Sequence, residues 1–497
     1  MAFTMTEIRD LRLFNSLTRS IDPFASIDPG KVRVYSCGPT VYNYAHLGNL
    51  RAYVFTDTLR RTLGWAGYDV THIINITDVG HLTSDADAGD DKMEAAARAQ
   101  AKSIWDIAAH YTEAFKSNIA DLNITAPTEW TVATDYVPQM IDFAKAIADR
   151  HCYELETGLY FDSSTVPDYG ALAGGRDDAA HARIDAVDGK RHPSDFAIWR
   201  RSPPGEQRQM EWDSPWGKGA PGWHLECSVM SFDRLGHPFD IHTGGIDHRE
   251  IHHPNEIAQN QAYCECGHDL PAGFTGARWW MHNNFLVDRS GKMSKSKGGF
   301  TTLFSLKDAG VHPLAYRLLC ISAHYRNELE FSGEIVATAL TRLKRLVMAV
   351  ERIRATASTE AKEQPFSGQE ALALVSLKEF DEAIREDLNT PTALTKLEQV
   401  LSIKKCPATI KLSLIREMDK VLGLKLDTIT RADLRVRPKD AVIEEAEIEA
   451  ELDRRQQARA DKDFAASDVI RDALIAKGVE VMDGDPLRWE WQINLGG

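Results

Sequence analysis

The most constraining feature of the sequence is a strand, a helix and a second strand that follow one another near the N-terminus. Residues 32–37 alternate like a strand and end at Gly38-Pro39. Apolar residues then recur at helical spacing over 55–63, and a stretch rich in β-branched residues follows at 70–76. A strand–helix–strand unit predicts a parallel pair, with a ligand crevice at the carboxyl ends of its strands.

The rest of the chain divides by texture. Turns and short runs over 127–221 predict an insertion, strand-like sequence returns at Phe239, and helical spacing dominates after Phe331. The sequence therefore predicts an α/β protein with a Rossmann-like parallel-sheet domain that carries an insertion. A helical bundle and a small C-terminal unit should follow. The expected segments are 1–126, 127–221, 222–290, 291–331, 332–430 and 431–497.

Composition excludes several classes of protein. Of 497 residues, 43% are hydrophobic and 26% are charged, and the formal net charge is −15. Such a charge argues against coating nucleic acid by bulk attraction, and no run approaches the roughly 18 apolar residues that a membrane span needs. The N-terminus lacks a leader pattern, and seven cysteines do not suggest a disulfide framework. We expect a cytoplasmic protein without a membrane partner.

Two short motifs point to nucleotide chemistry. His46-Leu47-Gly48-Asn49 lies where the first strand gives way to its helix, and helix N-termini with a nearby glycine bind phosphate. Alone, this tetrapeptide more often marks a turn. The second motif, 292–296, has the sequence Lys-Met-Ser-Lys-Ser and is flanked by glycines. Two lysines on such a loop can close over a triphosphate, and the alternative is a flexible basic loop.

In this order, the two motifs resemble the signatures of class I aminoacyl-tRNA synthetases. The match narrows to the cysteinyl-tRNA synthetases through four further segments and covers nearly the whole chain. These segments are 37–42 (CGPTVY), 75–78 (NITD), 222–228 (GWHLECS) and 252–259 (HHPNEIAQ).

The resemblance implies an enzyme that activates L-cysteine with ATP and transfers it to the 3′ end of tRNA(Cys). It implies that His46, Asn49, Lys292 and Lys295 are catalytic. ATP would contact His46, Gly48, Asn49 and Lys295, together with Mg²⁺. The amino-acid pocket would contain Cys37, Thr77, Trp223, His242 and Asp247. We expect the enzyme to be a monomer.

A zinc site is implied by the same resemblance. Its ligands would be Cys37, Cys227, His252 and Glu256, with one ion per chain. Zinc binds cysteine, histidine and carboxylate ligands, and a catalytic site leaves room for substrate, here a thiol. The chain departs from the family pattern at Pro254 and in the residues before the paired histidines, which leaves open whether His252 or His253 is the ligand. Asn49 and Gly299 also depart from the common pattern.

By the resemblance, 1–126 and 222–290 would be the two halves of the catalytic domain, and 127–221 a connective insertion. Residues 291–331 would hold the lysine loop and contact the tRNA stem, 332–430 would bind tRNA, and 431–497 would recognise the anticodon. Basic runs at 342–354 and 454–459 could contact phosphate or be solvated helix faces. Trp489 and Trp491 could stack on anticodon bases or belong to a small core.

Two other functions fit part of the pattern. A related ligase that joins cysteine to an amino-sugar would share the catalytic core but would not need the region after Phe331. A non-catalytic RNA-binding protein would explain the basic runs but not the lysine loop.

Overall fold

The computed structural model describes most of the chain. The described residues are 8–79, 93, 96–97, 103–166, 168–174, 188–203, 205, 208–265, 274–288, 291–292, 301–359, 368–493 and 495.

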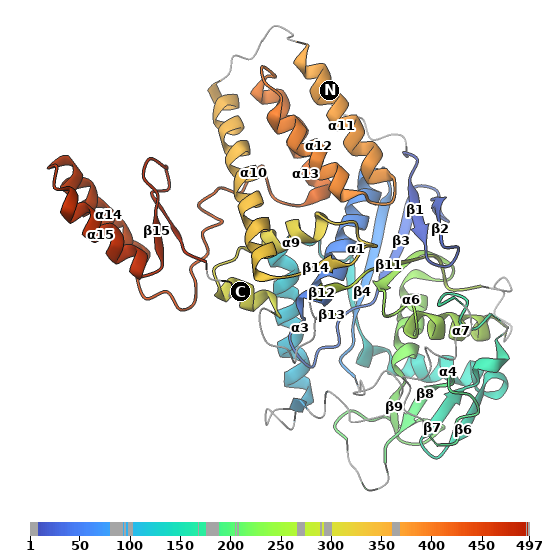
Figure 1. The fold of residues 1–497 in the computed structure, drawn as a ribbon. Helices are drawn as coiled ribbons and strands as arrows, with labels where there is room; N and C mark the ends of the chain where they lie inside the picture. Colours follow the sequence, from blue (N-terminus) through green and yellow to red (C-terminus); the bar gives the residue numbers. More distant parts are fainter. Residues whose placement is uncertain are drawn as a thin grey trace.

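The expected parallel sheet is confirmed (Figure 1). It has five strands in the order β11-β10-β3-β4-β5, and every neighbouring pair is parallel. The strands are β3 (Lys31–Ser36), β4 (Asp69–Ile76), β5 (Glu129–Val132), β10 (Phe239–Gly245) and β11 (Ala277–Asn283). From β3 the chain moves outward to β4 and β5, and from β10 it moves outward to β11 on the other side. The topological switch point therefore lies between β3 and β10.

Helices cover both faces of this sheet because side chains alternate along each strand. Val32 and Val34 of β3 pack in one apolar cluster with Leu59 of α1 (Leu47–Trp65). Tyr35, the residue after Val34, faces the other side of the sheet. It packs in a second cluster with Leu225 of α6 (Trp223–Leu235). Further helices are α3 (Ile104–Asp121) and α7 (His252–Glu265).

The insertion forms a sheet of its own. Strands β6 (Cys152–Leu155), β7 (Gly158–Phe161), β8 (Phe196–Arg201) and β9 (Gly219–Pro221) pair antiparallel in sequence order. Helix α4 (Val137–His151) leads into them. Because β5 pairs with β4, residues 129–132 belong to the parallel sheet, so the insertion starts after Val132 rather than at residue 127.

A third sheet, which is small, lies beside α1, and its strand β13 precedes the lysine loop in the chain. It has the order β13-β12-β14, with β12 (Leu286–Asp288), β13 (Gly291–Lys292) and β14 (Leu329–Glu330). Helices α8 (Leu303–Asp308) and α9 (Pro313–Ile321) lie between β13 and β14 in the chain. A hairpin of β1 (Arg12–Asn15) and β2 (Ser20–Pro23) precedes the main sheet.

The C-terminal part is helical, as expected. Helices α10 (Gly333–Thr359), α11 (Gln369–Arg385), α12 (Thr390–Ser402) and α13 (Ala408–Leu422) form a bundle (Figure 1). A separate unit contains α14 (Glu445–Ala460), α15 (Phe464–Ala476), β15 (Val479–Val481) and β16 (Trp489–Trp491), and it has its own apolar cluster. None of the helices in the described part of the chain is both long and apolar enough to span a membrane.

The tryptophans of β16 are core residues, so their interpretation as stacking platforms is wrong. Trp489 is 0% exposed and Trp491 is 4% exposed. The indole nitrogen of Trp489 donates to Glu449 at 2.6 Å, and the guanidinium of Arg435 lies 3.7 Å from the ring centroid. The two rings meet edge to face and close the core of the small unit.

Several arginines of the basic runs form ion pairs within the chain. Arg342 pairs with Glu398, and Arg455 and Arg459 both pair with Asp483. These arginines therefore carry less net charge to the surface than their spacing suggests. Arg345 and Arg352 of α10 are exposed.

A buried ion group joins the parallel-sheet domain to the helical bundle. Asp57 of α1 accepts from Arg317 of α9 at 2.6 Å and from Arg61 at 2.7 Å, and it also accepts from the backbone N–H of Thr125. The same Arg317 donates to the carbonyl of Leu422, the last residue of α13. Burial alone would raise the pKa of Asp57, but Arg317 and Arg61 hold it below its usual value.

Replacing this carboxylate should destabilise the whole chain. Asp57→Asn leaves the charge of Arg317 buried without its carboxylate, so we expect unfolding free energy to fall by about 3–5 kcal/mol at pH 7. Because the folded pKa is depressed, the stabilisation is present above the unfolded value of about 3.9 and is lost as pH falls through the folded value. Urea unfolding at pH 7 and at low pH should therefore show a gap from wild type that narrows with acid.

The control is Glu113→Gln, which removes an exposed ion pair with Lys116. An unchanged urea midpoint for Asp57→Asn at pH 7 would contradict the assigned role.

Candidate active site

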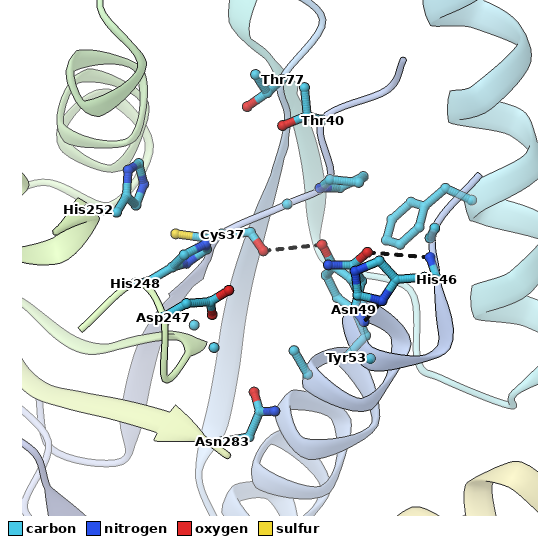
Figure 2. A pocket seen from close by; sticks show the side chains of 18 of the residues that line it. Cys37, Thr40, His46, Asn49, Tyr53, Thr77, Asp247, His248, His252 and Asn283 are labelled. Atoms are coloured by element: carbon cyan, nitrogen blue, oxygen red, sulfur yellow. Dashed lines mark hydrogen bonds between the residues drawn. The ribbon is translucent and has the colours of Figure 1, made fainter. Parts of the chain in front are cut away.

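A cavity of about 460 Å³ opens at the carboxyl ends of the parallel strands, where the strand order predicts it. Its walls come from the ends of β3, β4, β10 and β11 and the residues after them, from the first turns of α1, and from α3, α6 and α7. Figure 2 shows two groups of side chains facing this space from opposite sides. Cys37, Asp247, His248 and His252 lie at one side, and His46 and Asn49 lie at the other.

The turn 46–49 is built as a reciprocal helix cap. Nδ1 of His46 accepts from the backbone N–H of Asn49 at 3.1 Å, and the Asn49 side chain accepts from the backbone N–H of His46 at 3.3 Å. In the neutral ring the proton then resides on Nε2, which can donate to a phosphate oxygen. Asparagine at this position thus completes the cap. Gly48 also lines the cavity.

Close backbone packing fixes the position of Cys37. A Cβ on the next residue, Gly38, would lie 1.4 Å from the carbonyl oxygen of Asn75, so only glycine fits there. The N–H of Gly38 donates to the Asn75 side chain at 2.7 Å, and the N–H of Cys37 donates to the carbonyl of Thr243. The ends of β3, β4 and β10 are thereby held together at the cavity.

Four predicted ligand residues converge beside this cavity. One ligand atom from each of Cys37, Cys227, His252 and Glu256 lies within 4.8 Å of the others. Nε2 of His252 and Oε1 of Glu256 are 3.0 Å apart, yet both are buried without a hydrogen-bond partner. Two sulfurs, an imidazole nitrogen and a carboxylate oxygen form a donor set that zinc takes in proteins. The residues therefore fit a metal ion.

The paired histidines at the start of α7 belong to two different groups of possible metal ligands. His252 is the one that groups with both cysteines, whereas His253 groups with Cys37, His242 and Glu256. The ring of His253 is held by His282, at 2.8 Å from Nδ1. Nδ1 of His252 contacts Nδ1 of His224 at 2.9 Å, which turns its Nε2 toward Glu256.

The buried cluster shifts several pKa values. Burial would raise the pKa of Glu256, but His242 and His252 lower it to about 2. Burial would lower the pKa of His252, but Glu256 and Cys227 raise it to about 10. A hydrogen bond with Cys37, together with burial, holds the pKa of the Cys227 thiol well above its usual value. Burial likewise raises the pKa of Cys37. A metal ion would have to displace these thiol protons on binding.

The predicted pocket residues do not all reach the cavity. Cys37, Thr77, Trp223 and Asp247 line it, but His242 does not. His242 is 1% exposed and lies behind the metal-donor cluster, with Nε2 at 2.9 Å from Glu256. It therefore orients a cluster residue. The ring of Trp223 stacks on His252, with centroids 4.3 Å apart.

Thr77 links the pocket to a buried acid. Its hydroxyl donates to Glu226 at 2.9 Å and accepts from the Asn75 amide at 3.1 Å. Burial raises the pKa of Glu226 to about 8 although Thr77 opposes this, so the carboxyl is mainly protonated at pH 7.

Other cavity residues were not predicted from the sequence. Thr40, Tyr53, His248 and Asn283 line the space, and the hydroxyl of Tyr53 donates to the carbonyl of Cys37 at 3.3 Å (Figure 2). Asn283 could have been found, because it is the polar residue that ends β11. Of the predicted lysine loop, the side chain of Lys292 and all of Lys295 lie outside the described residues.

Known proteins resemble this chain over its length. Residues 23–341 match the family model of the class I tRNA synthetase (C) catalytic domain. The cysteine–tRNA ligase of Novosphingobium aromaticivorans is 62% identical and that of Zymomonas mobilis is 56% identical. The first match covers 97% of this chain and 97% of the Novosphingobium protein. The second covers 96% of this chain and 97% of the Zymomonas protein.

The fold is shared with more distant synthetases. Mycobacterium tuberculosis methionyl-tRNA synthetase bound to methionyl-adenylate aligns with a TM-score of 0.52 at 14% identity, over 79% of this chain and 90% of that one. The leucyl-tRNA synthetase of Agrobacterium radiobacter aligns with a TM-score of 0.51 at 13% identity. This alignment covers 83% of this chain and 88% of that one. With these matches over a shared fold and site, the chain belongs to the cysteine–tRNA ligase family of class I aminoacyl-tRNA synthetases.

Proposed function

We propose that this protein activates L-cysteine with ATP and transfers it to the 3′ end of tRNA(Cys). The observation that carries the proposal is one cavity with two kinds of wall. Cys37, Cys227 and His252, which group with the buried Glu256 as possible metal ligands, line one side, and the turn of His46 and Asn49, which would bind phosphate, lines the other. An amino acid and a nucleotide held between them would meet at the centre.

Activation requires positioning and charge stabilisation rather than a base. The cysteine carboxylate is already ionised at pH 7, so it can attack the α-phosphate of ATP as soon as the two are aligned. Nε2 of His46 and the N-terminus of α1 would bind the phosphates, with Asn49 completing the turn. Lys292 and Lys295, together with Mg²⁺ bound by ATP, would neutralise the departing pyrophosphate.

The four-residue cluster would hold one zinc ion. When bound, zinc would take the substrate thiol as a further ligand and so favour cysteine over serine, which an apolar pocket would distinguish by only about 10–200-fold. Trp223, Thr77 and Asp247 would enclose the rest of the amino acid. His242 and His224 would orient Glu256 and His252.

The remaining parts would serve tRNA. We assign the parallel sheet to catalysis, the insertion after Val132 and the 291–331 region to the acceptor end, the bundle to the tRNA body, and 431–497 to the anticodon. The exposed Arg345 and Arg352 would supply phosphate contacts. We propose a monomer in the cytoplasm, where the free thiols of the described cysteines would stay reduced.

The zinc assignment predicts a specific loss on changing Cys227. Cys227→Ser removes a soft ligand, so purified protein should contain much less zinc, and cysteine should bind more weakly while ATP binding stays nearly unchanged. Metal analysis and separate KM values in ATP–pyrophosphate exchange measure this. Cys264 is also buried but lies on α7, outside the predicted ligand set. The matched control is therefore Cys264→Ser, which should keep its zinc. A Cys227→Ser protein with full zinc would refute the ligand set.

The lysine loop predicts a rate effect without a binding effect. Lys295→Ala should slow adenylate formation by roughly 10²–10³-fold, because the charge it stabilises develops in the transition state. The KM for cysteine should change little in the same exchange assay. The exposed Lys116→Ala serves as the control. An intact rate with weaker cysteine affinity would show that Lys295 acts in binding.

The separate core of the C-terminal unit predicts that activation survives its removal. A chain that ends after Asp440 keeps Leu434 and the contact of Lys439 with Asp308 but lacks the small core. Exchange should stay close to the full-length rate, while charging should need on the order of tenfold more tRNA, since the unit assigned to the anticodon is lost. Equal loss of both activities in a folded truncate would mean that this unit supports the catalytic domain.

A further inference from the structure

A buried arginine lies two residues beyond the first signature motif. Arg51 of α1 is 2% exposed, although it follows Asn49 so closely in the chain. Its side chain does not line the cavity, and its guanidinium contacts two other segments of the chain. Neither the phosphate-binding turn nor the metal-donor cluster uses it.

The guanidinium binds backbone rather than side chains. It donates to the carbonyl oxygens of Asn284 at 2.8 Å and of Asn327 at 2.5 Å, and also to that of Phe285. The two segments are far apart in sequence, yet one planar group holds both. Arginine suits this task because its five N–H donors have a fixed geometry.

The two segments are the entries to the small sheet. Phe285 directly precedes β12, and Asn327 lies just before β14. Strand β12 pairs with β14 on one side and with β13 on the other, where Val287 faces Lys292. Arg51 therefore fixes the strands to which β13 is attached, and β13 is the strand from which the lysine loop continues in the chain.

The same segment also reaches the cavity. Asn283, Asn284 and Phe285 line it, as do His46 and Asn49 at the start of α1. A second contact, separate from those of Arg51, links α1 to the other end of the lysine loop. The N–H of Leu47 donates to the carbonyl of Thr301, the first described residue after that loop. Both ends of that loop are thus connected to the first turns of α1.

We infer that Arg51 is a positioning residue for adenylate formation. Its guanidinium sets the distance between the phosphate-binding turn of α1 and the strand β13 that carries Lys292, so that both signature motifs meet the same triphosphate. The inference rests on the proposed function. Arg51 contacts no substrate; it acts through the backbone of β12 and β14.

A double-mutant cycle tests this. Arg51→Met keeps the length of the side chain but removes the donors, and misplacing the lysine loop should slow exchange by about 10²-fold with an unchanged KM for cysteine. Lys295→Ala alone should slow it by roughly 10²–10³-fold. If Arg51 acts through the loop, the double variant should be no more than about threefold slower than the slower single variant.

Independent effects would multiply to about 10⁴-fold or more, and that outcome overturns the inference. Arg51→Lys should recover little of the rate, because one ammonium cannot span three carbonyls. If Arg51→Met does not fold, the same cycle is run with Arg51→Lys.

The matched control is Arg61→Met on the same helix. Arg61 also donates to backbone carbonyls, those of Asn123 and Lys420, but far from the small sheet. The Arg61→Met variant should have a lower urea midpoint but an exchange rate near that of the wild type. A slow exchange rate in Arg61→Met would mean that the effect of Arg51→Met comes from general loss of structure. Absence of cysteine-dependent exchange in the wild-type protein overturns the proposed function itself, whereas multiplicative effects in an active enzyme overturn only the role of Arg51.

Discussion

The parallel sheet is the constraint on which the rest of this structure depends. Because β3 and β10 are neighbours whose chains continue in opposite directions, no crossover covers the edge between them. The residues that end each strand are therefore delivered to one crevice. Cys37, Thr77 and Asn283 come from three different strand ends, and all line the same cavity. Neither the insertion nor the bundle needs to enter the sheet to add residues to this site.

Local patterns were enough to predict the parallel sheet. The alternation before Cys37 and the helical spacing after it depend only on neighbouring residues. The four donors came from the family resemblance, and the structure brings Cys37, Cys227, His252 and Glu256 together. The choice between His252 and His253 was not predictable from the sequence, since the two are adjacent on a helix.

What the sequence did not indicate depends on distant partners. Arg342 forms an ion pair with Glu398, and Arg455 forms one with Asp483. A basic run in the sequence is therefore not a basic surface in the fold. Trp489 is buried because β16 pairs with β15 and α14 covers it. The start of the insertion was misplaced because β5 has only four residues and little alternation to reveal it.

The donors of the metal cluster come from both sides of the inserted sheet: Cys37 precedes it, and Cys227, His252 and Glu256 follow it. In an unfolded chain these groups are separated by the whole insertion, and bringing them together requires closing a long loop. An ion held by all four would act as a cross-link between the two halves of the sheet. Its binding energy would then add to folding stability, and its retention would report that both halves are assembled.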